Sequence, residues 1–193
     1  MDLTQGTTEE KIGRAKKMML WFGIASMVMM FAGLTSAYVV SKSRPDWITD
    51  FQLPASLYWS TLVIVISSLT FILAKKSIAE GNRKNATFSL LATLGLGIAF
   101  VILQLEGFSE IISSGYYFTG SESTVTTSFI YVLVLAHLAH LAAGLIVLLV
   151  VIYNHFKQRY KPGQMLGIEL GATFWHFLDA LWVYLFVFLY FFR

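Results

Sequence analysis

Five long apolar runs constrain this chain more than any other feature of its sequence. They cover residues 18–40, 56–74, 86–106, 129–153 and 169–192. A hydrocarbon core roughly 30 Å thick is crossed by about 20 residues of α-helix. Because the runs are continuous rather than alternating, helices satisfy their backbone in lipid and a β-barrel is disfavoured. The sequence therefore predicts an all-α bundle of five transmembrane helices, in which a tail at 1–17 precedes a single domain at 18–193.

Composition excludes several classes of protein. The chain is 56% hydrophobic and 13% charged, which is outside the range of ordinary soluble domains. It contains no cysteine, so disulfides, thiolate metal sites and cysteine nucleophiles are excluded. Basic residues before the first run imitate a secretion signal, but that run exceeds 20 residues and continues into "SKSRPDW". We therefore expect a retained first span.

The basic residues are distributed unequally between the two sides of the predicted bundle. Eleven of the fourteen lie in the N-terminal tail, the second loop and the fourth loop, which share one side: Lys11, Arg14, Lys16, Lys17, Lys75, Lys76, Arg83, Lys84, Lys157, Arg159 and Lys161. Only Lys42, Arg44 and Arg193 fall on the other side. The positive-inside rule then predicts a cytoplasmic N-terminus and a periplasmic C-terminus.

Some of these basic residues are candidates for contact with anionic lipid headgroups at the inner edge of the membrane. The candidates are Arg14, Lys16, Lys17, Arg83 and Lys84. Their role in setting the topology explains them equally well. No basic and aromatic patch typical of nucleic-acid binding is present in the sequence, so no nucleic-acid partner is expected.

Ionisable residues inside the predicted spans are functional candidates, because each costs on the order of 2.5–3.5 kcal/mol on insertion scales. In the fourth span, His137, His140 and Gly144 lie within about 60° of one helix face. In the fifth span, one face of about 120° carries Trp175, His176, Asp179 and Trp182. We expect that face to point into protein, with His176 and Asp179 close enough to hydrogen-bond.

Three interpretations of the histidines remain open at this stage. They can join helices through hydrogen bonds, ligate a haem from facing helices, or relay protons together with Asp179. Two histidines three residues apart on one helix are a weak metal signal without a third ligand. Glu106 lies at the outer end of the third span, and this position favours an interfacial role over a catalytic one.

Several motifs together resemble one known family. They are "FWHFLDALW", with Trp175, His176, Phe177, Asp179 and Trp182; "IELGATF", with Glu169; "AHLAHLAAG", with His137, His140 and Gly144; and "EGNRK", with Glu80 to Lys84. In this order and spacing they resemble subunit III of the haem-copper terminal oxidases, over about residues 16–193. Five spans match the short form of that family, which lacks the first two helices of the seven-helix form. Where the family often has a Ser-Glu pair, this chain has Ser26 and Met27, so the role of the glutamate does not carry over.

The resemblance implies a non-catalytic subunit in the cytoplasmic membrane of a bacterium. It implies packing against subunit I of an oxidase that reduces oxygen with electrons from cytochrome c, together with lipid binding and support of proton uptake. Haems and copper would lie in subunits I and II, with no cofactor or metal on this chain. A small subunit IV and a respiratory supercomplex are further expected partners, and bound phospholipid is expected.

Three alternatives stay open. The chain could serve a quinol oxidase instead, because the electron-donor site is not on it. It could be the haem-bearing membrane anchor of another respiratory enzyme. It could also be a small transporter that uses Asp179 and Glu106 as proton carriers, although none of the three prolines breaks a span.

Overall fold

The computed structural model describes residues 7–45, 47–48, 53–120, 123–160 and 164–192. The described chain is helical, with α1 (Thr8–Val40), a short 3-10 helix η1 (Ser41–Ser43), α2 (Ala55–Ala79), α3 (Arg83–Ser113), α4 (Val125–Phe156) and α5 (Leu166–Phe192). The five α-helices are each long and apolar enough to cross a membrane. The predicted all-α architecture of five long apolar helices is confirmed.

The helices extend beyond the apolar runs because polar residues cap their ends. The Thr7 side chain accepts a hydrogen bond from the Glu10 backbone, and the Glu10 side chain accepts one from the Thr7 backbone. This capping box starts α1 at Thr8, so residues 8–17 of the expected tail are helical, whereas residues 1–6 lie outside the described part. An equivalent box between Thr124 and Thr127 begins α4. After the C-terminal end of α2, Gly81 takes φ +75°, a left-handed conformation that suits glycine after a helix.

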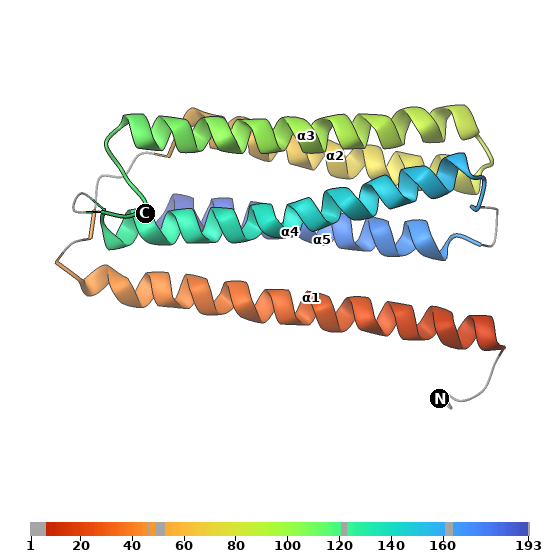
Figure 1. Ribbon diagram of the computed structural model, residues 1–193, viewed down its shortest axis with the longest axis horizontal. Helices are drawn as coiled ribbons and strands as arrows, with labels where there is room; N and C mark the ends of the chain where they lie inside the picture. The colour runs from red at the N-terminus through yellow and green to blue at the C-terminus, as the bar shows by residue number, and fades with distance from the viewer. Residues whose placement is uncertain (1–6, 46, 49–52, 121–122, 161–163, 193) are drawn as a thin grey trace.

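The helices pack in three layers. Figure 1 shows α2 and α3 side by side along one edge, α4 and α5 in the middle, and α1 along the opposite edge. The interface between α2 and α3 is the most extensive, α5 also packs on α2 and α4, and α1 packs on α4 and α5. The start of α1 and the end of α5 lie at opposite ends of the bundle (Figure 1). Which end faces the cytoplasm stays a prediction.

Glycines let the middle helices approach closely. A Cβ at Gly144 would lie 2.6 Å from a Leu178 methyl carbon, which is too close for two carbon atoms. A Cβ at Gly97 would lie 2.9 Å from the Trp175 ring. Small residues at such crossings are the usual means of close packing in lipid. The indole of Trp175, which projects from α5, therefore packs against both α3 and α4.

Helix α1 is the most exposed of the five helices. Only 17% of its most apolar stretch is buried, compared with 44% for α5. Contacts spaced along its length attach it, among them an ion pair of 3.3 Å between Lys17 and Glu169 and a hydrogen bond of 3.0 Å between the hydroxyls of Thr35 and Tyr184. Just beyond its end, in η1, the Lys42 ammonium lies 5.3 Å from the Phe192 ring centre. Much of the apolar surface of α1 thus faces outward, toward lipid or another polypeptide.

Candidate functional site

Hydroxyl groups of α2 meet the polar face of α5. The Trp175 indole N–H donates to the Ser67 hydroxyl at 3.1 Å, and the Trp182 indole N–H donates to the Thr61 hydroxyl at 3.0 Å. Both indoles are buried, with 1% and 0% of their surfaces exposed. An unmade hydrogen bond at such a site costs about 1–3 kcal/mol, so α2 supplies the partners that make buried tryptophans tolerable.

His176 also bonds to α2 rather than to its own helix. Its Nδ1 shares a hydrogen bond of 2.6 Å with the Ser68 hydroxyl, and its ring lies against Phe71, with centroids 5.9 Å apart. The pairing of His176 with Asp179, which the three-residue spacing favours, is not formed. The rotamer of His176 is set by the neighbouring helix, which the spacing within α5 does not report.

Asp179 lies on the same face of α5, between His176 and Trp182. It follows His176 by one turn and precedes Trp182 by one turn, and only 4% of its surface is exposed. Neither of its carboxylate oxygens has a hydrogen-bond partner among the residues that the structure describes. The nearby Ser68 hydroxyl of α2 is engaged with His176. Asp179 is thus a buried carboxyl held at a helix interface with little compensation.

A second polar layer joins α2 to α3. The Gln104 side chain donates to the Ser60 hydroxyl at 2.8 Å, and both residues are buried. Roughly three helical turns further along α2, Thr70 and Thr93 share a hydrogen bond of 2.8 Å. These bonds and those from Trp175, His176 and Trp182 of α5 together form a polar seam along α2. The α2 residues of the seam are Ser60, Thr61, Ser67, Ser68 and Thr70. This seam tightens the bundle by interhelical hydrogen bonds.

The α2 side of this seam is not among the residues expected from the sequence. The signal is present, because Ser60 and Thr61 are followed seven residues later by Ser67 and Ser68 in an otherwise apolar run. Seven residues are close to two helical turns, so both pairs recur on one face. Gln104 lies near the outer end of the third apolar run, yet only 1% of its surface is exposed.

The two histidines of α4 face different neighbours. His137 is fully buried between the Phe100 and Trp182 rings, with centroids at 6.0 and 5.1 Å, and neither of its nitrogens has a partner among the described residues. His140 donates from Nδ1 to its own helix at the Ala136 carbonyl and lies edge-on to Phe31 of α1. His176 faces α2. The three side chains therefore point into three different interfaces.

The described residues contain no group of three or more His, Cys, Asp or Glu side chains able to hold a metal ion. Glu106 is exposed on α3, whereas Asp179 is buried on α5. The carboxylates named for the transporter alternative therefore do not share an environment. Chemically, the seam offers interhelical hydrogen bonds, among them the Ser68–His176 pair, and one buried carboxyl, that of Asp179.

The residues expected to contact lipid headgroups lie near the start of α1 and the start of α3. Lys16, Lys17, Arg83 and Lys84 are exposed, and Arg14 is partly buried. The ammonium of Lys17 pairs with the Glu169 carboxylate. Glu169 thus links α5 to α1 in this structure.

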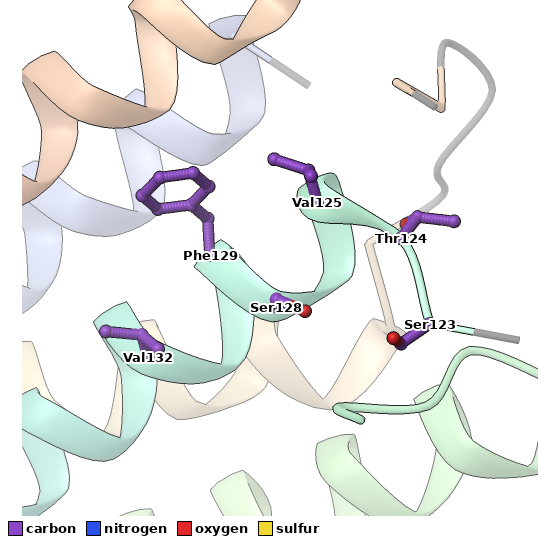
Figure 2. Close-up of a pocket in the computed structure, with 6 residues that line it drawn as sticks. All are labelled: Ser123, Thr124, Val125, Ser128, Phe129 and Val132. Carbon is purple, nitrogen blue, oxygen red and sulfur yellow. The ribbon is translucent and has the colours of Figure 1, made fainter. Parts of the chain in front are cut away.

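At the opposite end of the bundle, a surface hollow of about 410 Å³ lies beside the first turns of α4. Figure 2 shows its lining residues, Ser123, Thr124, Val125, Ser128, Phe129 and Val132. The Phe129 ring packs edge-on to Tyr38 of α1, with centroids 6.0 Å apart. Among the described residues, only hydroxyl and apolar groups line this hollow, without an acid, a base or a metal-ligating side chain.

Comparison with known proteins identifies relatives over almost the whole chain. The family model for cytochrome c oxidase subunit III matches residues 4–193. A protein named cytochrome c oxidase subunit 3 from Loxodonta africana is 32% identical over 180 residues, covering 86% of this chain and 66% of that protein. One of the same name from Bacillus sp. (strain PS3) is 27% identical over 182 residues, covering 92% of this chain and 86% of that protein. The chain thus spans slightly under two thirds of the mammalian relative and most of the bacterial one.

Proposed function

The chain belongs to the cytochrome c oxidase subunit III family, and we propose that it is the non-catalytic third subunit of a proton-pumping haem-copper oxidase. The match of the family model over residues 4–193 carries this proposal. The polar seam supports it, because the intramembrane polar side chains of α5 are used mainly to hold α2. Such a chain stabilises an assembly and leaves electron transfer to its partners.

In this proposal the chain lies in a bacterial cytoplasmic membrane with its N-terminus inside and its C-terminus in the periplasm. It packs on subunit I, binds phospholipid and supports proton uptake and the integrity of the oxygen-reducing site. Subunits I and II hold the haems and copper, and a small subunit IV or a supercomplex can join them. The exposed apolar surface of α1 offers area for contacts with lipid or a partner. Cytochrome c is the proposed electron donor, with a quinol as the alternative.

The haem-bearing anchor is the second candidate, and the histidine geometry does not favour it. Ligation by two histidines requires imidazoles that face each other across a haem. His137, His140 and His176 instead face α3, α1 and α2 respectively.

Purification of the affinity-tagged chain from its native membrane in mild detergent tests the proposal. We expect subunits I and II to co-purify, with haem absorbance in the complex and none in the chain expressed alone. We also expect an oxidase stripped of this chain to start at similar turnover but to lose activity sooner. A low-spin haem spectrum from the chain alone, or its purification without oxidase subunits, would contradict the proposal.

A further inference from the structure

The outward side of α1 carries a regular seven-residue pattern. From Ile12 to Val40, exposed residues follow one another in alternating steps of three and four, and we call the residues at these steps the heptad face. The opposite side, with Phe31 and Tyr38, is buried against rings of α4 and α5. Figure 1 shows α1 along the outer edge of the bundle, so within the described chain the heptad face is unpartnered. An average step of 3.5 residues is the repeat of helices that pack along each other at a shallow angle.

The large side chains of the heptad face differ from those on the outer surfaces of neighbouring helices. Met19, Phe22, Met29 and Val40 are each 72–75% exposed. Five of the seven methionines of the chain lie in α1, whereas the large exposed residues of α2 and α3 are mostly Leu, Ile and Val. Methionine is unbranched and adapts to the irregular surface of a binding partner. The composition of the heptad face therefore favours contact with another polypeptide.

Small residues separate these large side chains on the same face. They are Ala15, Ser26, Gly33 and Ser36. A methyl group at Gly33 would meet nothing within 4 Å, so packing inside this chain does not require a glycine there, although glycine weakens a helix relative to alanine. Small residues allow a second membrane helix to approach closely, and serine hydroxyls form hydrogen bonds across such contacts. The heptad face thus alternates knobs with holes for another helix.

Two exposed lysines flank the heptad face near the start of α1. Lys11 directly precedes Ile12, and Lys16 directly follows Ala15. Side chains at these flanking positions select the partner in paired helices through their charges. A second copy in the same membrane would run parallel to the first and bring Lys11 of one copy close to Lys16 of the other, so the two positive charges would repel. A shallow hollow of about 390 Å³ at this end, lined in part by Lys11 and Phe22, leaves room for side chains of a partner.

We propose that the heptad face of α1 binds one transmembrane helix of a different polypeptide, which carries acidic residues where it passes Lys11 and Lys16. This inference rests on the proposed function and gives its packing with partner subunits a surface and a charge preference. The face extends for about 42 Å along the helix axis. Because the hydrocarbon core is about 30 Å thick, the bound helix crosses the whole membrane beside α1.

Site-specific crosslinking in the native membrane tests the contact. A photoreactive amino acid replaces single residues of the full-length chain, and the adducts are identified by mass spectrometry. We expect adducts to one polypeptide at Phe22 and Met29, within a transmembrane helix that has Asp or Glu near the end facing Lys11. Val28 is the matched control, because it adjoins Met29 but faces the groove toward α5. Adducts to lipid alone, adducts to a second copy, or equal adducts at Val28 would each overturn the proposal.

Close approach is tested by Gly33→Leu, which places a large side chain between the two helices. We expect the amount of the crosslinked polypeptide that co-purifies with the chain to fall about tenfold. Gly95→Leu is the control, since Gly95 of α3 is an exposed glycine whose added Cβ also meets nothing within 4 Å. Neither change should alter the unfolding midpoint of the isolated chain. Equal losses of the polypeptide in both variants, or no loss in Gly33→Leu, would contradict close packing at this face.

The charge preference is tested by reversing both flanking lysines. Lys11→Glu combined with Lys16→Glu should release the polypeptide, whereas Lys84→Glu combined with Lys157→Glu makes the same change in net charge away from α1 and should retain it. Equal retention in the two double variants would show that the flanking charges do not select the partner, and would overturn that part of the proposal.

The outcomes separate this inference from the proposed function. Recovery of subunits I and II with the tagged chain, but without polypeptide adducts on the heptad face, refutes only the inference. Adducts with the expected spacing in a preparation that lacks oxidase subunits refute the proposed function and leave the docking face standing.

Discussion

Asp179 is a carboxyl residue that lies 4% exposed in the middle of a membrane-length helix. Its neighbours on the same face, His176 and Trp182, direct their polar atoms to α2 and not to it. A buried polar group without a hydrogen bond keeps its full desolvation cost. Asp179 therefore contributes little to the stability of this chain.

The prediction for Asp179 differs from what spacing alone suggests. If His176 were its partner, Asp179→Leu would strand a histidine and destabilise the chain. Because Ser68 already satisfies His176, we expect Asp179→Leu to stabilise the isolated chain by roughly 1–3 kcal/mol, with Asp179→Asn closer to the parent. Thermal unfolding in detergent, followed by tryptophan fluorescence, measures this. A lower midpoint for the leucine variant than for the asparagine variant would show that the carboxyl has a partner.

At the scale of helices, the contacts of α5 are made in two different ways. Toward α2 it uses hydrogen bonds from Trp175, His176 and Trp182. Toward α3 and α4 it uses close approach at Gly97 and Gly144, where a side chain would collide with Trp175 or Leu178. The Trp175 ring takes part in both kinds of contact, because it donates to Ser67 of α2 and packs at Gly97 of α3. The packing of α5 on α2 and α3 therefore depends on the position of this ring.

Gly97→Ala tests this dependence. The new methyl group would lie 2.9 Å from the rigid, buried Trp175 ring and 3.1 Å from Leu145, so the ring must move away from Ser67. We expect destabilisation of about 1–3 kcal/mol, typical of overpacking. Gly95→Ala is the control, since a methyl group there meets nothing within 4 Å and favours the helix. Equal unfolding midpoints for the two variants would show that the α3–α5 contact can relax.

At the scale of the whole molecule, five helices place the two ends of the described chain on opposite ends of the bundle (Figure 1). The charge asymmetry predicts that the N-terminal end faces the cytoplasm, because eleven of the fourteen basic residues lie in the N-terminal tail and in the second and fourth loops. A cavity lined in part by Lys17, Lys75 and Glu169 lies at the same end.

Reporter fusions after Arg193 and in the segment between α2 and α3 test this orientation. We expect alkaline phosphatase to be active at the C-terminus and inactive between α2 and α3, whereas green fluorescent protein gives the opposite result. As a control, Arg83→Gln combined with Lys84→Gln should weaken the asymmetry without reversing it, since nine of the basic residues at that end remain. A fluorescent C-terminal fusion would place this end in the cytoplasm and invert the assignment.

The sequence by itself determined the number of helices, their approximate extents and the family. Runs of apolar residues longer than a bilayer core allow no other local structure in lipid, and the motif around Trp175, His176 and Asp179 is specific. Helix ends such as Thr8 were less predictable, because a capping box adds turns that hydropathy does not detect. The end of α3 was also less predictable, because the apolar run stops at residue 106 whereas the helix continues to Ser113.

Only the tertiary structure decided the partners of each polar side chain. Periodicity places His176 and Asp179 on one face, but a side chain bonds to the best available group, and that group, Ser68, is 108 residues away in the chain. For the same reason Lys17 pairs with Glu169 across two helices, although its position at the membrane edge suggested a lipid contact. Spacing along a helix fixes which residues share a face, whereas the neighbouring helix fixes what that face contacts.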